Sequence, residues 1–450
     1  MPTLMVSVSG IRGIIGDGLF PQEILKYTSA FADFSGNGKI IIGTDGRISG
    51  DMVKNLVIGS LLAKGNDVID IGIVPTPTVL FNIKNLKAVG GIQISASHNP
   101  NEWNALKLMN KNGEFLSPEE NKLMLSNLNS SSAKYSSWNK LGKLSVYSKG
   151  LEDHIAAVLK TPFINIRKIR NRRFRVLLDC VNGAGAYSMP VLLKKLGCDV
   201  IEFNCEKTGI FPRLPEPIPQ NLKSTMKAVK KFNADIGIVV DPDVDRLVLI
   251  TEKGEPFGEE NTITQAIKFY LSKQKGIAVI NLSTSRSAED VAKELGSVVY
   301  RSSVGEANVV KKMKEVKAII GGEGSGGVIL PAVNFGRDAL VGTIIMLQHL
   351  LEFGGTMSEL KNILPKYFIV KKKIELGKAN PDTIIKNLQK KYSSGKVNTE
   401  DGLRIDFDDH WVQFRKSNTE PIIRCTVEAK NKKSAESLAE KYLAELKRYF

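Results

Sequence analysis

Most of this chain repeats one pattern of apolar and polar positions three times. Each repeat holds three short apolar runs that are typical of buried strands, and the segments between them carry apolar residues at helical spacing. Strands that alternate with amphipathic helices indicate parallel α/β units, which bind ligands at the carboxyl ends of their strands. The predicted strands span residues 39–45, 66–72, 90–97, 175–180, 198–204, 234–241, 277–283, 297–303 and 316–324.

The last part of the chain has a different pattern, in which three strand-like segments precede one long amphipathic helix. This order predicts a smaller α+β domain that closes over the other three. A Ser- and Lys-rich stretch at 127–150 has the composition of a connection after the first repeat. We therefore predict an α/β protein with four domains around a central cleft and with mixed sheets in the three repeated domains. The expected domain boundaries are 1–149, 150–253, 254–365 and 366–450.

Composition and charge narrow the function classes. The 450 residues are 42% hydrophobic and 24% charged, as in ordinary globular proteins. A formal net charge of +16 raises the possibility of a nucleic-acid partner, for which the basic run at 167–173 is the best candidate patch. That run has no interleaved aromatic residues for base stacking, and other lysines, such as Lys227 and Lys230, fall on helix faces. We expect no nucleic-acid partner, because positive charge also steers phosphorylated metabolites toward a protein.

Targeting signals and cysteine spacing concern the cellular compartment. No apolar run is long enough to span a bilayer, and the N-terminus lacks the basic and apolar regions of a secretory signal. The four cysteines show no C-x-x-C spacing. We expect reduced packing cysteines in a cytoplasmic protein that has no membrane partner.

In every repeat the third predicted strand ends in a loop of unusual composition. The first loop presents Ser97 beside His98, and Lys107 follows in what we expect to be the next strand. A serine alone is weak evidence, because most serines cap helices or fill turns. The corresponding loops of the other repeats lie at 241–246 and 323–326. One cleft shared by all three loops is the simplest explanation.

The second loop alternates three carboxylates, Asp241, Asp243 and Asp245, after an apolar strand. Extended backbone would place all three on one face, where a hard divalent cation such as Mg²⁺ would relieve their repulsion. A solvated acidic turn is the alternative. An EF-hand is excluded because Arg246 occupies the place that needs glycine and because the flanking segments are predicted strands. Arg246 instead suits a phosphate oxygen.

The third loop is rich in glycine and formally matches G-x-G-x-x-G at 322–327. A dinucleotide fingerprint should open a helix, but the residues that follow are apolar and include a proline. Glycines that let Glu323 and Ser325 approach a ligand fit better, because a carboxylate and a hydroxyl suit sugar hydroxyls. A tight structural turn remains the alternative for this loop.

Two further segments offer anion-binding groups. The segment 415–421 joins two predicted strands of the last domain with basic, hydroxyl and amide side chains, and Arg424 follows it. Together with turn backbone N–H groups, these donors predict an anion site, with a polar hairpin loop as the alternative. Near the N-terminus, Ser9-Gly10-Ile11-Arg12-Gly13 suggests a close approach of backbone in which Arg12 reaches an anion.

In their order along the whole chain, the motifs SGIRG, SASHNPNEWNALK, DPDVDR, GEGSG and RKSNTEP resemble those of the α-D-phosphohexomutase superfamily. The resemblance implies a phosphoserine, an Mg²⁺ ion, a hexose bisphosphate as activator and a mobile C-terminal lid domain. Ser97 would carry the phosphoryl group and, with the three aspartates, hold Mg²⁺. The other implied site residues are His98 and Lys107 for acid/base work and orientation, Arg12 and Arg246 for the transferring phosphoryl group, Glu323 and Ser325 for the sugar, and Arg415, Ser417, Asn418 and Thr419, with Arg424 near them, for the second phosphate.

This chain departs from the family pattern at four positions, none of which removes a functional group. Serine begins SASHNP where many members have threonine, Gly327 stands where bacterial relatives often have histidine, and Pro242 and Val244 replace small glycines.

The identity of the sugar depends on one more loop. The loop at 303–306 resembles that of phosphoglucosamine mutases, in which Glu306 would favour the ammonium group of glucosamine phosphate. We therefore expect a phosphoglucosamine mutase acting as a monomer or homodimer, with phosphomannomutase/phosphoglucomutase as the alternative. A non-catalytic sugar-phosphate sensor and a phosphatase are more distant alternatives.

Overall fold

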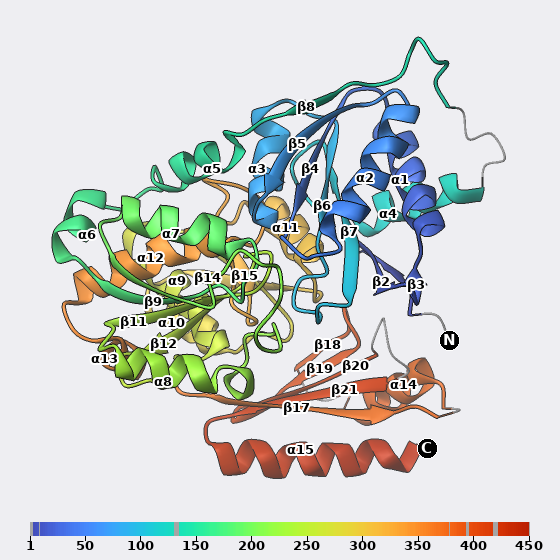
Figure 1. Cartoon of the computed structure of the whole chain (residues 1–450). Coiled ribbons are helices and arrows are strands. Elements are labelled where there is room, and N and C mark those ends of the chain that lie inside the picture. Colours follow the sequence, from blue (N-terminus) through green and yellow to red (C-terminus); the bar gives the residue numbers. More distant parts are fainter. Residues whose placement is uncertain are drawn as a thin grey trace.

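The computed structural model describes residues 3–8, 10–129, 135–377, 379–392, 396–416 and 422–449. These residues form four sheets, one in each expected domain, and we number the domains I to IV by the boundaries given above. In the view of Figure 1, domain I lies beside domains II and III, and domain IV lies below them.

The first three domains share one sheet topology, which confirms the repeated α/β organisation and the mixed sheets. In each, the first strand of the repeat lies between the second and third, all three run parallel, and a fourth strand pairs antiparallel with the third. All nine predicted strands are present. The equivalent strand orders are β5-β4-β6-β7, β10-β9-β11-β12 and β14-β13-β15-β16.

Domain I extends this sheet at both edges with short strands that the apolar pattern did not predict. Helices α1 and α2 cover one face of the sheet and α3 covers the other. The strands are β1 (Met5–Ser7), β2 (Gly10–Ile15), β3 (Gly18–Leu19), β4 (Lys39–Thr44), β5 (Asp67–Ile73), β6 (Gly90–Ile94), β7 (Trp103–Asn110) and β8 (Leu144–Val146). The helices are α1 (Pro21–Ser35), α2 (Gly50–Ala63), α3 (Thr76–Asn85), α4 (Pro118–Ser126) and η1 (Asn127–Asn129).

Domains II and III share one continuous apolar core, so their loops stand on one packed unit. The elements of domain II are α5 (Gly150–Val158), α6 (Ile166–Arg172), β9 (Arg175–Asp179), α7 (Gly185–Lys195), β10 (Asp199–Phe203), η2 (Pro219–Asn221), α8 (Lys223–Lys231), β11 (Ile236–Val240) and β12 (Leu247–Thr251). Those of domain III are α9 (Glu259–Lys273), β13 (Ile277–Asn281), α10 (Ser287–Glu294), β14 (Val298–Ser302), α11 (Glu306–Glu315), β15 (Ile320–Glu323), β16 (Gly327–Ile329), α12 (Ala339–Phe353) and α13 (Met357–Asn362).

Domain IV is an antiparallel sheet with helices packed on one face, as the α+β prediction requires. Its opposite face contacts domain III, where Arg286 Nη2 lies 3.1 Å from Asp406 Oδ1 and Ser283 Oγ donates to Gln413 over 2.6 Å. The elements are β17 (Phe368–Glu375), α14 (Pro381–Lys391), β18 (Lys396–Asn398), β19 (Leu403–Asp406), β20 (His410–Lys416), β21 (Ile422–Ala429), α15 (Lys432–Leu446) and η3 (Lys447–Tyr449).

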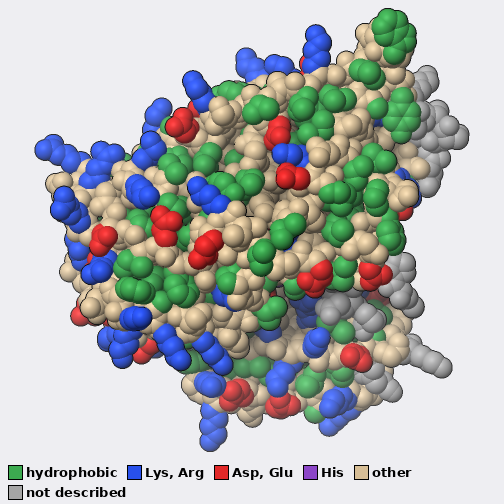
Figure 2. Space-filling model, in the orientation of Figure 1, with side chains coloured by type: hydrophobic (Ala, Val, Ile, Leu, Met, Phe, Trp, Pro, Cys, Tyr) green, Lys and Arg blue, Asp and Glu red, His purple; other side chains and the backbone are tan. Residues whose placement is uncertain are grey.

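The surface carries charges of both signs, and the cysteines form no disulfides. On the face in Figure 2, Lys and Arg side chains are spread over much of the surface with acidic side chains among them. Cys180, Cys198, Cys205 and Cys425 are all free thiols. Among the described residues, no helix combines the length and apolar composition that a membrane crossing requires.

Candidate active site

The loop after β6 holds Ser97 in a left-handed backbone conformation, with φ of +50°. Such strain is uncommon outside glycine and is often kept at functional sites. A buried guanidinium supports the loop, because Arg47 donates to the carbonyl oxygens of Ser97 at 2.5 Å and Asn99 at 2.8 Å. Asp45 Oδ2 in turn lies 2.9 Å from Arg47 Nε. Sequence analysis missed Arg47, because a lone arginine in a loop belongs to no recognisable pattern.

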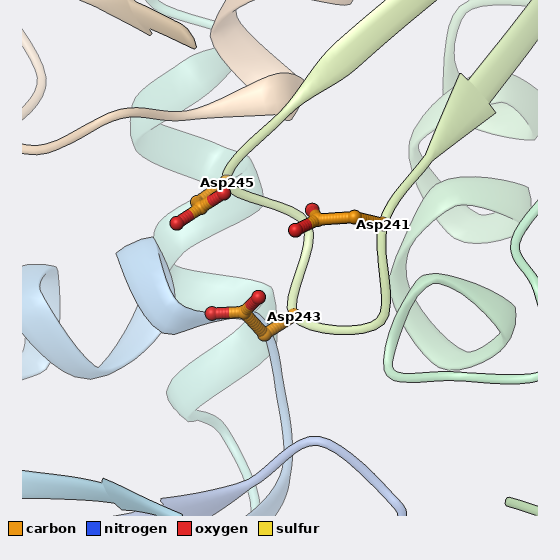
Figure 3. A group of neighbouring side chains, drawn as sticks. All are labelled: Asp241, Asp243 and Asp245. Atoms are coloured by element: carbon orange, nitrogen blue, oxygen red, sulfur yellow. The ribbon is translucent and has the colours of Figure 1, made fainter. Parts of the chain in front are cut away.

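The serine loop and the acidic loop meet in space. Ser97 Oγ donates to Asp241 Oδ2 over 2.9 Å, and carboxylate oxygens of Asp241, Asp243 and Asp245 all lie within 4.8 Å of one another (Figure 3). The expected reason for this convergence was wrong. The segment 241–246 is a turn rather than extended backbone, in which the Val244 N–H donates to the Asp241 carbonyl over 3.1 Å.

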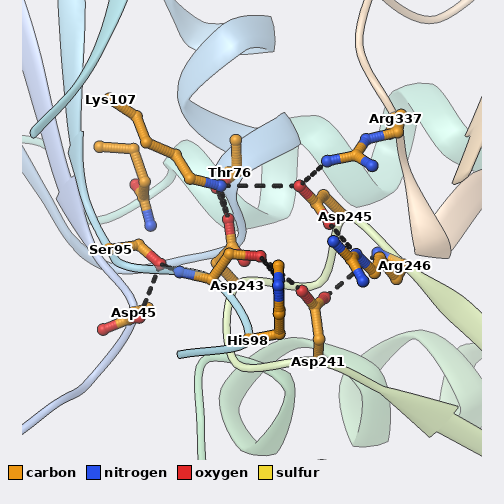
Figure 4. A network of polar contacts seen from close by, with 12 residues as sticks. Asp45, Thr76, Ser95, His98, Lys107, Asp241, Asp243, Asp245, Arg246 and Arg337 are labelled. Atoms are coloured by element: carbon orange, nitrogen blue, oxygen red, sulfur yellow. Dashed lines mark hydrogen bonds and ion pairs between the residues drawn. The ribbon is translucent and has the colours of Figure 1, made fainter. Parts of the chain in front are cut away.

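In both Asp243 and Asp245, one carboxylate oxygen accepts a hydrogen bond and the other has no partner among the described residues. Asp243 Oδ2 accepts a hydrogen bond from Lys107 Nζ at 2.6 Å, and Asp245 Oδ2 accepts one from Arg337 Nη2 at 2.6 Å (Figure 4). The other oxygen of each, Oδ1, is buried and has no hydrogen-bond partner among the described residues. Buried carboxylate oxygens without partners are costly, and oxygen ligands of this kind are those that Mg²⁺ prefers. The acidic loop therefore fits an Mg²⁺ ion.

Mutual repulsion within this group supports the same conclusion. Burial, together with the charges of Asp245 and Asp243, raises the pKa of Asp241 well above its ordinary value. A bound divalent cation would offset both effects and keep the carboxylate ionised.

Lys107 extends from β7 into the same cluster. Its Nζ lies 2.6 Å from Asp243 Oδ2 and 3.6 Å from Asp245 Oδ2. Burial acts to lower the pKa of Lys107, but the two carboxylates outweigh it, so that the pKa is raised and the side chain is an ammonium cation. It can therefore donate a proton or a hydrogen bond to an oxygen placed beside the acidic loop.

His98 is neutral, in contrast to the positively charged Lys107. The charge of Arg246, then burial and the charge of Arg12, lower the pKa of His98 well below its ordinary value. The neutral ring has Nδ1 3.4 Å from Ser97 Oγ. It can accept or donate a hydrogen bond beside the serine without adding positive charge.

The two predicted phosphate-binding arginines point toward the serine loop and the acidic loop. Arg12, on β2, donates to Asn99 Oδ1 over 2.6 Å. The expected close backbone approach is present here, since a Cβ at Gly10 would lie 2.4 Å from the Leu106 carbonyl oxygen. Arg246 Nε is buried with no hydrogen-bond partner among the described residues and lies 3.9 Å from Asp245 Oδ1. Arg246 therefore has donor capacity for an anion.

The glycine loop is a turn between β15 and β16. Glu323 is buried, and its Oε1 accepts from Asn281 Nδ2 at 2.7 Å and from the Gly305 N–H at 3.0 Å. Ser325 lies half-buried in the turn itself. This arrangement places a fixed carboxylate and a hydroxyl on one loop.

Glu306 begins α11 and contacts Arg337, a residue that sequence analysis did not identify. Its Oε1 accepts from the Arg337 N–H and its Oε2 from Arg337 Nε, each over 2.9 Å. Burial raises the pKa of Glu306 to about 7, although Arg337 opposes the shift.

The expected distal phosphate site lies on domain IV. Arg415 and Arg424 are directly opposite each other on the antiparallel strands β20 and β21. Like charges at opposite positions destabilise a sheet, and a bound anion would offset this repulsion. Asp401 contacts Arg415 Nε at 2.9 Å. Ser417, Asn418 and Thr419 lie outside the described residues.

Comparison with known proteins identifies the family. The chain matches all four domains described for phosphoglucomutase/phosphomannomutase, which are alpha/beta/alpha domains I, II and III and the C-terminal domain, over residues 4–134, 152–254, 260–367 and 370–445. The chain belongs to the phosphoglucomutase/phosphomannomutase family. This confirms the resemblance to α-D-phosphohexomutases and makes the chain an isomerase of that class.

Relatives and solved structures match over nearly the whole chain. The chain is 36% identical to the phosphoglucomutase/phosphomannomutase of Thermococcus kodakarensis, covering 96% of each chain. It is 33% identical to a probable phosphoglucosamine mutase of Methanopyrus kandleri, covering 97% of this chain and 96% of the relative. A family protein of Burkholderia thailandensis has the same fold, with a TM-score of 0.86, 24% identity and coverage of 99% and 98%.

Proposed function

We propose that this phosphohexomutase interconverts hexose 6-phosphates and hexose 1-phosphates through a phosphoserine at Ser97 and a bisphosphate intermediate. The observation that carries the proposal is the contact of Ser97 Oγ with Asp241 Oδ2 at 2.9 Å. This contact places the hydroxyl of Ser97, whose backbone is strained, beside an acidic cluster that fits a cation. A serine there is well placed to give and receive a phosphoryl group.

Two phosphoryl transfers complete the reaction. First, the free hydroxyl of a hexose monophosphate attacks phosphorus on Ser97 and gives up its proton, and the bond from phosphorus to Oγ breaks as Oγ takes up a proton. The hexose bisphosphate then turns over in the cleft. Ser97 Oγ next gives up its proton and attacks phosphorus at the other end, and the released sugar oxygen takes up a proton. The number of phosphoryl groups on enzyme and sugar together stays constant.

Charge neutralisation is the main catalytic task in such a transfer. Asp241, Asp243 and Asp245 would hold Mg²⁺ together with the phosphate on Ser97. When bound, Mg²⁺ would neutralise negative charge on the phosphoryl oxygens. Arg246, with buried donor capacity beside the acidic loop, would contact the same oxygens.

Proton transfer and charge stabilisation fall to neighbouring side chains. The ammonium of Lys107 would stabilise or protonate the departing oxygen, and the neutral ring of His98 would orient the reacting hydroxyl. Arg12 is supported on β2 and already contacts the serine loop through Asn99, so it would add a second arginine to the transferring group.

The sugar and its second phosphate would lie between domains III and IV. Glu323 and Ser325 would contact sugar hydroxyls, and Arg415 with Arg424 would hold the phosphate that is not transferred. Domain IV would act as a lid that keeps water from the phosphoserine and retains the bisphosphate. A trace of hexose bisphosphate would act as activator by restoring phosphate that Ser97 loses to water.

We propose glucosamine phosphate as the preferred substrate, with mannose and glucose phosphates as the alternative. Glu306 and the name of the Methanopyrus relative support glucosamine, whereas the Thermococcus relative supports the alternative. Both oxygens of Glu306 already accept hydrogen bonds from Arg337, so its charge is shared between Arg337 and any substrate ammonium.

A side-by-side mutase assay tests both levels of this proposal. The purified protein, Mg²⁺ and a trace of the matching bisphosphate would be incubated with the 1-phosphates of glucosamine, mannose and glucose. A clear preference for glucosamine 1-phosphate supports the substrate assignment, and a preference for mannose or glucose overturns it while keeping the reaction. Phosphate release without isomerisation would instead indicate a phosphatase, and binding without any turnover would indicate a sensor.

A further inference from the structure

Arg337 joins three loops of the proposed active site. It precedes α12, and its side chain is only 12% exposed. Its guanidinium contacts Asp245 Oδ2 at 2.6 Å, Glu306 Oε2 at 2.9 Å and Glu323 Oε2 at 2.9 Å. One arginine therefore connects the acidic loop of domain II with the start of α11 and the glycine loop of domain III.

The contact with Asp245 decides how that carboxylate is presented. Arg337 donates to Oδ2, which also lies 3.6 Å from Lys107 Nζ. Oδ1 has no hydrogen-bond partner among the described residues and lies 3.9 Å from Arg246 Nε (Figure 4). A carboxylate held through one oxygen cannot rotate freely, so Oδ1 keeps one orientation. Partners of this kind orient metal ligands and tune the site.

The contacts with Glu306 and Glu323 hold the Arg337 guanidinium in one position. Glu306 uses both of its oxygens on Arg337, and Glu323 is fixed on its other side by Asn281 and the Gly305 N–H. The planar guanidinium has five donors in a fixed fork, so three carboxylates can bind it at defined angles. A lysine would supply the charge without this geometry.

The Arg337 side chain packs directly against Gly327, where only a glycine leaves room for it. A Cβ at Gly327 would lie 2.3 Å from Cδ and 2.9 Å from Cγ of Arg337. A residue with a side chain at 327 would therefore push Arg337 aside without changing any charge. Gly327 is one of the positions at which this chain departs from the family pattern, and the packing of Arg337 gives a physical reason for glycine there.

We propose that Arg337 is a positioning residue that fixes Asp245 for metal binding and couples the acidic loop to the sugar-contacting glycine loop. The inference rests on the proposed metal site and phosphoryl transfer. It assigns to Glu306 the role of holding Arg337. A change at Arg337 should therefore alter metal affinity and sugar-phosphate KM together, although Arg337 itself contacts neither in this assignment.

Two variants that perturb Arg337 by independent routes test the proposal. Arg337→Lys keeps the charge and loses the fork, and Gly327→Ala keeps the arginine and displaces it. Gly59→Ala is the matched control, because a Cβ at Gly59, within α2, meets no atom within 4 Å. The measurements are Mn²⁺ affinity by titration in electron paramagnetic resonance, thermal unfolding, and kcat and KM in the mutase assay.

We expect both variants to bind Mn²⁺ and turn over substrate roughly 10–100-fold less well than the wild type, with a raised sugar-phosphate KM, while Gly59→Ala behaves as wild type. Cooperative unfolding of both variants shows that they are folded. If Arg337→Lys fails to fold, Gly327→Ala alone decides. Folded variants with wild-type Mn²⁺ affinity and KM would overturn the role of Arg337. Failure of the wild type to bind Mn²⁺ or to isomerise any hexose phosphate would instead overturn the proposed function.

Discussion

Ser97 Oγ and Asp241 Oδ2 are joined by a 2.9 Å hydrogen bond across 144 residues of sequence. The bond links the loop after β6 of domain I with the loop after β11 of domain II, so each loop contributes one half of a single site. Neither loop alone contains all the groups of the proposed phosphoryl transfer, so the proposed site depends on the relative position of the two domains.

Replacing Ser97 by alanine should abolish turnover and leave sugar-phosphate binding intact. The variant lacks the oxygen that carries the phosphoryl group, whereas the arginines and glutamates that would bind substrate are unchanged. Turnover is measured in the mutase assay, binding by calorimetry, and phosphate on the protein by intact mass. Ser126→Ala, at an exposed hydroxyl on α4, is the control and should keep wild-type activity. Near-normal activity of Ser97→Ala would refute the phosphoserine mechanism.

Asp243→Asn should weaken the response to Mg²⁺ and lower kcat. Asparagine removes one charge from the acidic loop and replaces the carboxylate 2.6 Å from Lys107 Nζ by a neutral amide. We expect at least the roughly tenfold loss that follows removal of a partner outside the metal's own ligands. The check is the Mg²⁺ concentration that gives half-maximal activity. Asp51→Asn, at a largely exposed carboxylate on α2, should leave it unchanged. An unaltered Mg²⁺ requirement in Asp243→Asn would count against this metal site.

The three parallel strands of each repeat were predictable because each is a short apolar run that ends in polar or glycine-rich chemistry. β17 was not, since Lys371, Lys372 and Lys373 interrupt its apolar positions, although Val370 and Ile374 pack against the core of domain IV. β1 and β3 have three and two residues, too few for any period to show, and two glycines and Arg12 interrupt the apolar positions of the six-residue β2.

Side chains that act across domains were the part of the site that sequence could not supply. Arg337 lies 14, 31 and 92 residues from Glu323, Glu306 and Asp245. Such separations follow no period, so only the folded chain reveals that the four groups meet. Arg47 is missed for another reason, because most of its acceptors are backbone carbonyls, which any sequence provides.

Glu260→Gln should make the free energy of unfolding fall less steeply as pH rises. Burial raises the pKa of Glu260 from its ordinary value of 4.5 to about 8, with Lys371 opposing the shift. The folded state thus binds a proton that the unfolded state loses. This stabilisation is complete below about pH 4.5 and is lost as pH rises through about 8, by up to about 1.4 kcal/mol per pH unit. Glutamine cannot ionise and does not contribute this loss.

Thermal unfolding from about pH 5 to about pH 9 measures the effect of Glu260. The stability of Glu260→Gln relative to the wild type should increase with pH up to about pH 8 and level off above it. Glu294→Gln, which removes an exposed carboxylate that contacts Lys268 at 3.0 Å, is the matched control and should run parallel to the wild type. A Glu260→Gln curve that is also parallel to the wild type would show that the buried carboxyl does not take up a proton on folding.

Arg415→Gln should raise the KM for hexose phosphate far more than it lowers kcat. Arg415 lies opposite Arg424 on domain IV, whereas Ser97 lies on domain I, so Arg415 would bind the phosphate equally in the ground and transition states. Loss of a hydrogen bond to a charged group costs roughly 1.5–3 kcal/mol, or about 10–100-fold in KM. Lys372→Gln removes a charge on β17 that pairs with Glu440 at 2.8 Å and should change KM little. A fall in kcat at unchanged KM would place Arg415 in the chemical step instead of in the distal phosphate site.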